Sequence, residues 1–136
     1  MVRLSAITYY AIRAMIDLAM NSSARTTIPA IAERQGISRK FLPAVLQSLI
    51  QAGLVHSVRG WGGGVELSAD PKKITIQQII ESVEGPQLLY ADYMQQSDSQ
   101  LNKVLKRAGD AMFNILGSTT LADLIPKTTK DSAKKK

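Results

Sequence analysis

Apolar residues recur at steps of three and four along much of this 136-residue chain, a spacing that predicts amphipathic helices. Two shorter runs are strand-like instead and flank a glycine-rich segment. The pattern therefore predicts a mainly α (α+β) fold, in which a few helices carry one small hairpin. The expected helices are 6–20, 28–35, 39–52, 76–84 and 99–116, and the expected strands are 54–58 and 65–67.

The first expected helix follows Ser5, a residue type that suits the N-cap position. Its apolar positions recur on one side, which predicts a face that packs against the rest of the domain. We expect that face to consist of Ile7, Tyr10, Ala11, Ala14, Met15, Leu18 and Ala19.

Two short helices with a tight connection are predicted next. Thr27 suits the N-cap of the first, Pro29 is tolerated in its first turn, and Gly36 suits its end because glycine adopts the left-handed conformation readily. Ser38 is the expected cap of the second, and Gly53 is its expected end. The apolar positions of the second helix are Phe41, Leu42, Val45, Leu46 and Leu49.

A hairpin follows these helices, and its tip reads Arg-Gly-Trp-Gly-Gly-Gly over residues 59–64. The order of elements predicts a winged helix-turn-helix. We expect the single histidine, His56, to be a wing strand residue with a structural or DNA-facing role, because no carboxylate lies near it in sequence to complete a metal site.

Charge supports nucleic-acid binding by this segment. From Gln35 to Val65 the chain has no Asp or Glu, while Arg39, Lys40 and Arg59 are basic. A surface that faces phosphate is expected to have this balance. Ser38, Arg39 and Lys40 at the start of the second helix suit a major groove, and Arg3, ahead of the first helix, suits a phosphate. The pattern leaves open a winged helix used for protein contacts, with these cations merely solvated.

The C-terminal half begins with Thr75 and Gln78, a capping-box pair ahead of a short amphipathic helix that Gly85-Pro86 ends. We expect residues 87–100 to form either a short helix or a packed loop. We expect Gly117 to end the long helix that follows, Thr119 to cap a last turn with Leu121, Leu124 and Ile125, and Pro126 to stop it. Residues 127–136 are lysine-rich and expected to be mobile.

The long helix from about 99 to 116 carries an apolar stripe with small alanines, which permit close helix approach. Two interpretations are open: the stripe packs against a second copy of the chain, which we favour, or it folds back on its own domain. The stripe consists of Leu101, Val104, Leu105, Ala108, Ala111, Met112, Ile115 and Leu116.

Composition excludes several function classes. The chain has no cysteine, so it has no disulfide, thiol nucleophile or cysteine-ligated metal. It also lacks a histidine–carboxylate grouping and a phosphate loop ahead of a helix, so we expect no enzyme, and we expect no cofactor. No run of about 18 apolar residues is present, and the N-terminal apolar stretch is interrupted by Arg13 and Asp17, so the expected location is the cytoplasm, without membrane contact.

The chain resembles the Rrf2 family of bacterial winged-helix regulators up to about Pro126. The resemblance rests on YAIRAMIDLA (10–19), IAERQGIS (31–38), Phe41-Leu42, GLVHSVRGWGGGVEL (53–67), ITIQQIIESVEGP and TTLADLI. It implies a homodimeric regulator of transcription that binds double-stranded DNA, and we expect this chain to be a sequence-specific repressor. By position it implies DNA contacts from Ser38, Arg39, Lys40, Ala44 and the wing arginine Arg59. Gly60 and Trp61 beside it are further candidate contacts, and for Trp61 stacking on sugar, packing under the wing and lining a small-molecule pocket are all open.

Departures from the family pattern affect the implied function. Sensing members carry three cysteines after the helix that ends here at Gly85, and residues 87–100 have none, so a cysteine-ligated iron–sulfur cluster is impossible in this chain. Pro43 and Ala44 stand where such members carry base-contacting Glu and Gln, and Pro43 is expected to bend the helix. Ile7 replaces a basic residue, and Trp61 is unusual at a wing tip.

The expected organisation is a DNA-binding domain over residues 1–86, a loop, dimerisation helix and final short helix over 87–126, and a tail over 127–136. The regulatory signal is open between a small-molecule effector and a regulatory protein partner. A winged-helix protein-interaction module that has lost specific DNA binding is the alternative function.

Overall fold

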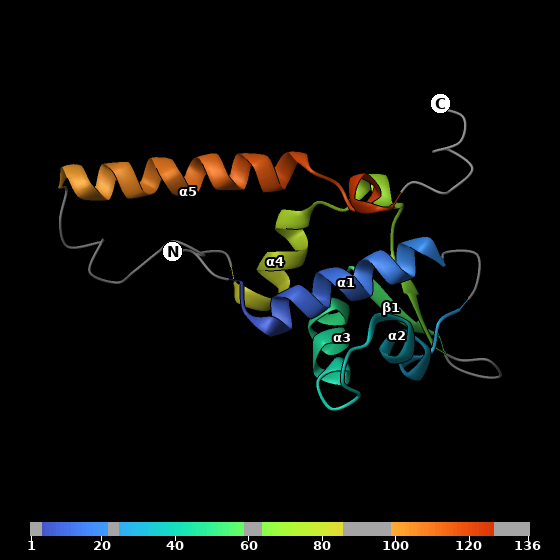
Figure 1. Ribbon diagram of the computed structural model, residues 1–136. Coiled ribbons are helices and arrows are strands. Elements are labelled where there is room, and N and C mark those ends of the chain that lie inside the picture. The colour runs from blue at the N-terminus through green and yellow to red at the C-terminus, as the bar shows by residue number, and fades with distance from the viewer. Residues whose placement is uncertain (1–3, 22–24, 59–63, 86–98, 127–136) are drawn as a thin grey trace, which may run out of the picture.

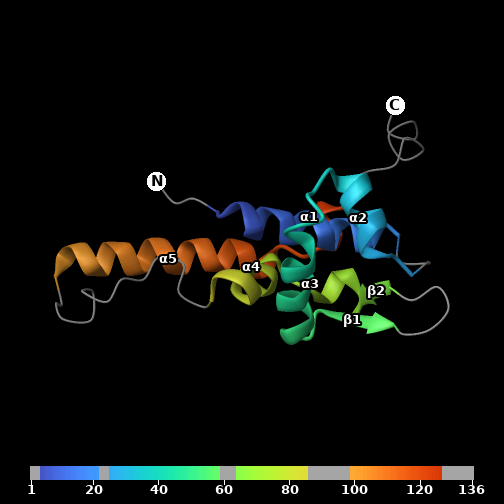
Figure 2. The same ribbon diagram turned by 90° about the horizontal axis from the view of Figure 1, so that it is seen from below.

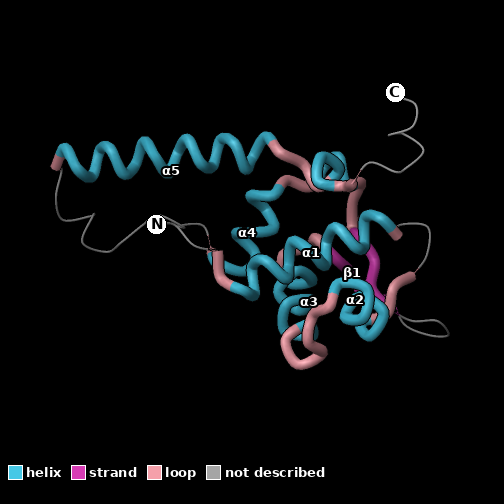
Figure 3. Tube along the Cα trace, viewed as in Figure 1, coloured by secondary structure: helices cyan, strands magenta, loops and turns pink. Residues whose placement is uncertain are grey.

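The computed structural model of the chain describes residues 4–21, 25–58, 64–85 and 99–126. Its body is helical, with a two-stranded sheet at one end and a long helix at the other (Figures 1 and 3). This arrangement confirms the predicted mainly α fold. In chain order the elements are α1 (Ala6–Met20), α2 (Ile28–Gln35), α3 (Leu42–Gln51), β1 (Val55–Val58), β2 (Gly64–Leu67), η1 (Pro71–Lys73), α4 (Ile76–Glu84), α5 (Gln100–Ser118) and η3 (Ala122–Leu124).

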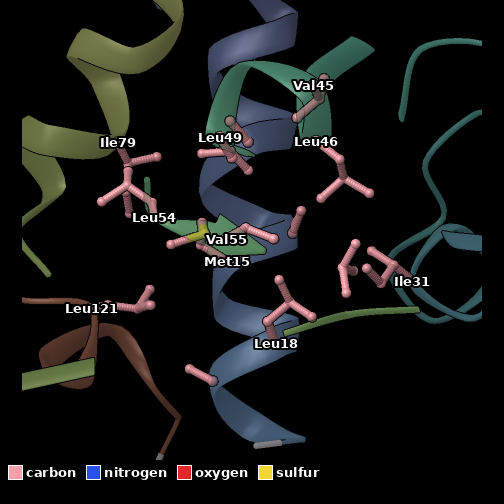
Figure 4. Close-up of a cluster of buried hydrophobic side chains, with 14 of the residues drawn as sticks. Met15, Leu18, Ile31, Val45, Leu46, Leu49, Leu54, Val55, Ile79 and Leu121 are labelled. Carbon is pink, nitrogen blue, oxygen red and sulfur yellow. The ribbon is translucent and has the colours of Figure 1, made fainter. Parts of the chain in front are cut away.

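Helix α1 is the centre of the core, and α2, α3 and α4 all pack against it. Met15 of α1 is fully buried and lies among Leu49 of α3, Val55 of β1 and Leu121 near the C-terminal end of the described chain (Figure 4). The core therefore joins the helix-turn-helix to the segment after α5.

The N-cap of α1 is as predicted, since the Ser5 hydroxyl accepts a hydrogen bond from the Thr8 N–H at 3.1 Å. The predicted place of Ile7 on the buried face is wrong, because its side chain is 42% exposed. Thr8 is the buried residue of this first turn, and its hydroxyl donates to Glu84 at the end of α4. Because α4 covers the Thr8 side of α1, Ile7 lies at the open edge.

Helix α2 has the predicted ends: Thr27 accepts from the Ala30 N–H, and Gly36 has a φ of +64°. The predicted start of the next helix is wrong. Residues 39–41 form a turn, Ser38 accepts from the Lys40 N–H rather than capping α3, and α3 begins at Leu42. Pro43 explains this start. Proline is tolerated in a first turn, whereas a helix from residue 39 would place it where an N–H donor is needed. Pro43 thus sets the start of α3 instead of bending it.

The hairpin forms as predicted, with Val55 opposite Leu67 and Val58 opposite Gly64. Strand β2 also bridges to Thr26, just ahead of α2, through N–H···O bonds of 2.8 and 3.3 Å with Val65. Gly64 is required there, because an added Cβ would lie 2.4 Å from the Thr26 carbonyl oxygen. The hairpin is therefore fixed to the helix-turn-helix at its base.

The predicted capping box of α4 is present, with Thr75 and Gln78 each accepting from the other's backbone N–H. Helix α5 is capped by Ser99 but continues through Gly117 to Ser118. Gly117 marks a close approach rather than a helix end, since a Cβ there would lie 2.5 Å from the Gln77 side-chain oxygen. The last turn is a 3-10 turn in which Thr120, not Thr119, pairs with Asp123.

Helix α5 contacts the body through α4, and its N-terminal half extends away from it (Figures 1 and 2). The hairpin extends in the opposite direction, as Figure 2 shows. Among the residues the structure describes, no helix is both long and apolar enough to cross a membrane.

Candidate nucleic-acid interface

Helix α3 has one buried and one exposed side. Leu42, Val45, Leu46 and Leu49 lie in the core, which confirms four of its five predicted apolar positions. The prediction that Phe41 lies on the same apolar face is wrong, since this residue is 44% exposed. The opposite side presents Pro43, Ala44, Gln47 and Gln51 to solvent. A helix fixed by one side, with the other free over its whole length, has the form needed to enter a major groove.

The turn before α3 brings cations to the exposed start of that helix. Ser38, Arg39 and Lys40 are all exposed, and the Lys40 ammonium lies 5.9 Å from the centre of the Phe41 ring. This turn and α3 carry no acidic residue. Three of the predicted contact residues are therefore grouped on one accessible surface, beside Ala44.

The hairpin places His56 and Glu66 opposite each other across the two strands. His56 Nε2 lies 2.7 Å from Glu66 Oε1, and its Nδ1 lies 3.3 Å from the Ser68 hydroxyl. The expectation that no carboxylate accompanies His56 is therefore wrong, because strand pairing brings Glu66 to it from ten residues away. In the part of the chain that the structure describes, no three His, Cys, Asp or Glu residues group as metal ligands. The remaining predicted contact residues, Arg59, Gly60, Trp61 and Arg3, lie outside the described residues.

A polar cluster that the sequence did not predict joins α1 to α2. Asp17 is 1% exposed, and its carboxylate accepts from Arg34 at 2.7 and 2.9 Å and from Gln35 at 3.1 Å. Arg13 donates to the Gln35 backbone oxygen and lies over the Tyr9 ring, 5.6 Å from its centre. We call Arg13, Asp17, Arg34 and Gln35 the α1–α2 polar cluster. The hydrogen bond to Asp17 raises the pKa of Arg34.

The cluster fixes the end of α2 just before the turn that leads to α3, so it orients the whole helix-turn-helix. The signal in the sequence was Asp17 itself, an acid flanked by buried apolar positions of an amphipathic helix. A charge at such a position requires a partner. Sequence alone did not show that the partner would come from a helix 17 residues away.

A second polar contact joins the start of α1 to the end of α4. The Glu84 carboxylate accepts from the Thr8 hydroxyl at 2.6 Å and from the Ser5 N–H at 3.3 Å. These hydrogen bonds, chiefly that from Thr8, lower the pKa of Glu84 below its ordinary value.

Glu84→Gln should make stability less dependent on pH at the acid end. Because the pKa of Glu84 is lower in the folded state than in the unfolded state, where it is near 4.5, its ionised form stabilises the fold at every pH above 4.5. This stabilisation is lost as the pH falls through the lower, folded-state pKa. We expect the variant to lose about 0.5–1 kcal/mol at pH 7, because the group is largely exposed, and to match the wild type near pH 3. Thermal melts from pH 3 to 7 measure this, with Asp110→Asn as the matched control. A deficit that persists at pH 3 would contradict it.

The apolar positions of α5 divide between two sides of the helix. Leu105, Met112 and Leu116 are half-buried, and Leu116 packs against the core. Leu101, Val104 and Ile115 are 57–66% exposed, and Ala108 and Ala111 lie exposed between them. We call these five exposed residues, which are part of the predicted set of eight, the α5 stripe. The interpretation that the helix folds back on its own domain thus applies only to the side of α5 that carries Leu105, Met112 and Leu116. The α5 stripe, on the other side, is exposed to solvent.

Known proteins are similar to this chain in sequence and in fold. The family model described as Rrf2, iron-dependent transcriptional regulator, matches residues 4–127. The HTH-type transcriptional regulator IscR of Escherichia coli is 36% identical over 129 residues, which cover 90% of this chain and 80% of that protein.

Two solved structures resemble the fold. CymR, the global cysteine regulator of B. subtilis, has a TM-score of 0.81 and 33% identity, over 91% of this chain and 96% of that one. IscR of T. potens has a TM-score of 0.77 and 33% identity, over 98% of this chain and 90% of that one. These relatives are regulators, in agreement with the expectation that the chain is no enzyme. With its helix-turn-helix, wing and long last helix, the chain belongs to the Rrf2 family of transcriptional regulators.

Proposed function

We propose that this chain is a sequence-specific DNA-binding regulator that acts as a homodimer and represses transcription. The observation that carries the proposal is the exposed, acid-free surface formed by α3 and the cationic turn before it. It is attached through β2 and Thr26 to a hairpin whose tip contains Arg59. A helix and a wing on one rigid base suit simultaneous contact with a major and an adjacent minor groove.

The α5 stripe supports the homodimer. Three large apolar side chains more than half exposed on one side of a helix form a seam of the coiled-coil type, with alanines between them that let a second helix approach closely. A two-fold pair would present two α3 helices to successive turns of DNA, about 34 Å apart. A dimer that occupies both grooves over a promoter would exclude polymerase, and we therefore propose repression.

The residues present do not fit the cysteine-ligated cluster that an iron-dependent family suggests. The chain has no cysteine, and its one histidine is paired with Glu66 and Ser68 on the wing. We propose that regulation comes instead from a small effector or a protein partner. A thermal-shift screen against metabolites separates them: a ligand that raises the melting temperature and changes DNA affinity supports an effector, and a screen without one supports a partner.

Arg59→Ala should weaken operator binding by about 1–3 kcal/mol, roughly 5- to 150-fold, if this arginine enters the minor groove. Fluorescence anisotropy with an operator selected from a random duplex pool measures the change. Lys106→Ala, which removes an exposed cation from α5, serves as the control and should bind normally. Unchanged affinity in the Arg59 variant would exclude this role.

The alternative is a winged-helix protein-interaction module, which exposed Ile7 and Pro43 favour because neither provides a polar contact to DNA. Salt dependence distinguishes the two functions. For a phosphate-binding surface, the logarithm of the DNA association constant falls linearly with the logarithm of the salt concentration, and the slope becomes steeper by about 0.9 for each phosphate contacted. A protein-interaction module shows no such slope on duplex DNA.

A further inference from the structure

Phe41 is a large apolar side chain that the start of α3 leaves exposed. It is 44% exposed, while its neighbour Leu42 is fully buried. It stands immediately before α3, where its backbone oxygen accepts from the Val45 N–H at 3.2 Å. Its position is therefore fixed by the helix start, and its ring lies at the leading end of the surface described above.

The surroundings of Phe41 indicate what it faces. Lys40 lies over its ring, and Ser38 and Arg39 are exposed in the same turn, so the ring is flanked by groups suited to phosphate. Ala44 follows three residues later, on the same side of the helix, and is exposed too. Neither Phe41 nor Ala44 has a hydrogen-bonding side chain. This edge of α3 is thus an apolar surface next to the cations of the preceding turn.

The major groove has one apolar feature that such an edge can read, the C5-methyl group of thymine. We propose that Phe41, with Ala44 beside it, is a specificity-determining residue that contacts a thymine methyl in each half-site. The inference rests on the proposed DNA-binding function and specifies which chemical group the start of α3 selects. Polar readout is left to Ser38 and Gln47, and Arg39 and Lys40 hold the backbone.

The test removes the methyl group without changing base pairing. Each thymine of a selected operator is replaced singly by deoxyuridine, and the affinities of the wild type, Phe41→Ala and Phe41→Tyr are measured by anisotropy. We expect one symmetry-related position where deoxyuridine weakens wild-type binding about fourfold, the value of one buried methyl group. Substitution in both half-sites should give about fifteenfold.

Phe41→Ala should lose this sensitivity at that position alone, and Phe41→Tyr, which keeps the ring, should retain it. Melting temperatures of the variants confirm that each is folded. If the wild type and Phe41→Ala respond to deoxyuridine alike at every position, Phe41 reads no methyl group and the inference is overturned. If no operator can be selected, the proposed function itself fails, which is a distinguishable result.

Discussion

Val104→Glu should convert the protein into a monomer and reduce operator affinity by at least about 100-fold. Val104 belongs to the α5 stripe and is 57% exposed, so a glutamate there is tolerated by the folded monomer. In a paired helix the same carboxylate would be buried against apolar groups without a partner, which is strongly unfavourable. A monomer must bind each half-site separately and loses the gain from linking the two sites.

Sedimentation equilibrium gives the oligomeric state, and anisotropy gives the affinity. Lys106→Gln is the matched control, because it changes the net charge by the same amount two residues further on, about 200° around the helix. It should remain dimeric and bind normally. A Val104→Glu protein that is still dimeric would show that the α5 stripe is not the interface.

Arg34→Ala should lower the free energy of unfolding by about 3 kcal/mol, because it leaves a buried carboxylate without its main partner. Asp17 is 1% exposed, and Gln35 alone cannot replace the two hydrogen bonds from the guanidinium. The reverse change, Asp17→Asn, should cost less, since the Arg34 side chain is 41% exposed and can be hydrated. Urea denaturation at one fixed protein concentration measures both.

The double variant Asp17→Leu/Arg34→Met provides the control for this asymmetry. Replacing both charges by apolar groups of similar size removes the stranded carboxylate, so the double variant should be more stable than Arg34→Ala. If Arg34→Ala lies within about 0.5 kcal/mol of the wild type, as surface substitutions usually do, the α1–α2 polar cluster does not hold the helix-turn-helix together.

Local signals in the sequence were sufficient for most element boundaries. Ser5, Thr27 and Thr75 all accept the predicted capping hydrogen bonds, and Ser99, which was expected inside its helix, caps it in the same way. Each of these bonds spans only three residues, so they depend little on tertiary structure. The glycine at position 36 likewise adopts the left-handed conformation that a helix end requires.

Features that depend on two distant elements were not predictable in the same way. Thr8 is buried in place of Ile7 because Glu84, 76 residues later, accepts its hydrogen bond. Gly117 suggested a helix end, but α5 continues to Ser118, and Gly117 lies inside the helix facing the Gln77 side chain of α4. Periodicity merged two sides of α5 into one apolar face, because it does not show where the body of the domain ends.

The start of α3 shows a conflict between two local signals. Ser38 favours a cap, whereas Pro43 requires the helix to begin no earlier than its own first turn, and Pro43 prevails. That outcome places Phe41 before the helix and in solvent. It therefore adds an exposed aromatic ring to the candidate interface. The family pattern implies DNA contacts from this segment, and it assigns no role to Phe41.

Selection of duplex fragments from a random pool by the purified protein, at about physiological salt, tests the central claim most directly. The account predicts recovery of a single pseudo-palindromic motif whose half-site centres lie about one helical turn of DNA, or a multiple of it, apart. Selection repeated with Val104→Glu should fail to recover that motif. A wild-type selection that enriches no motif, alone or with cell extract added, would contradict the account.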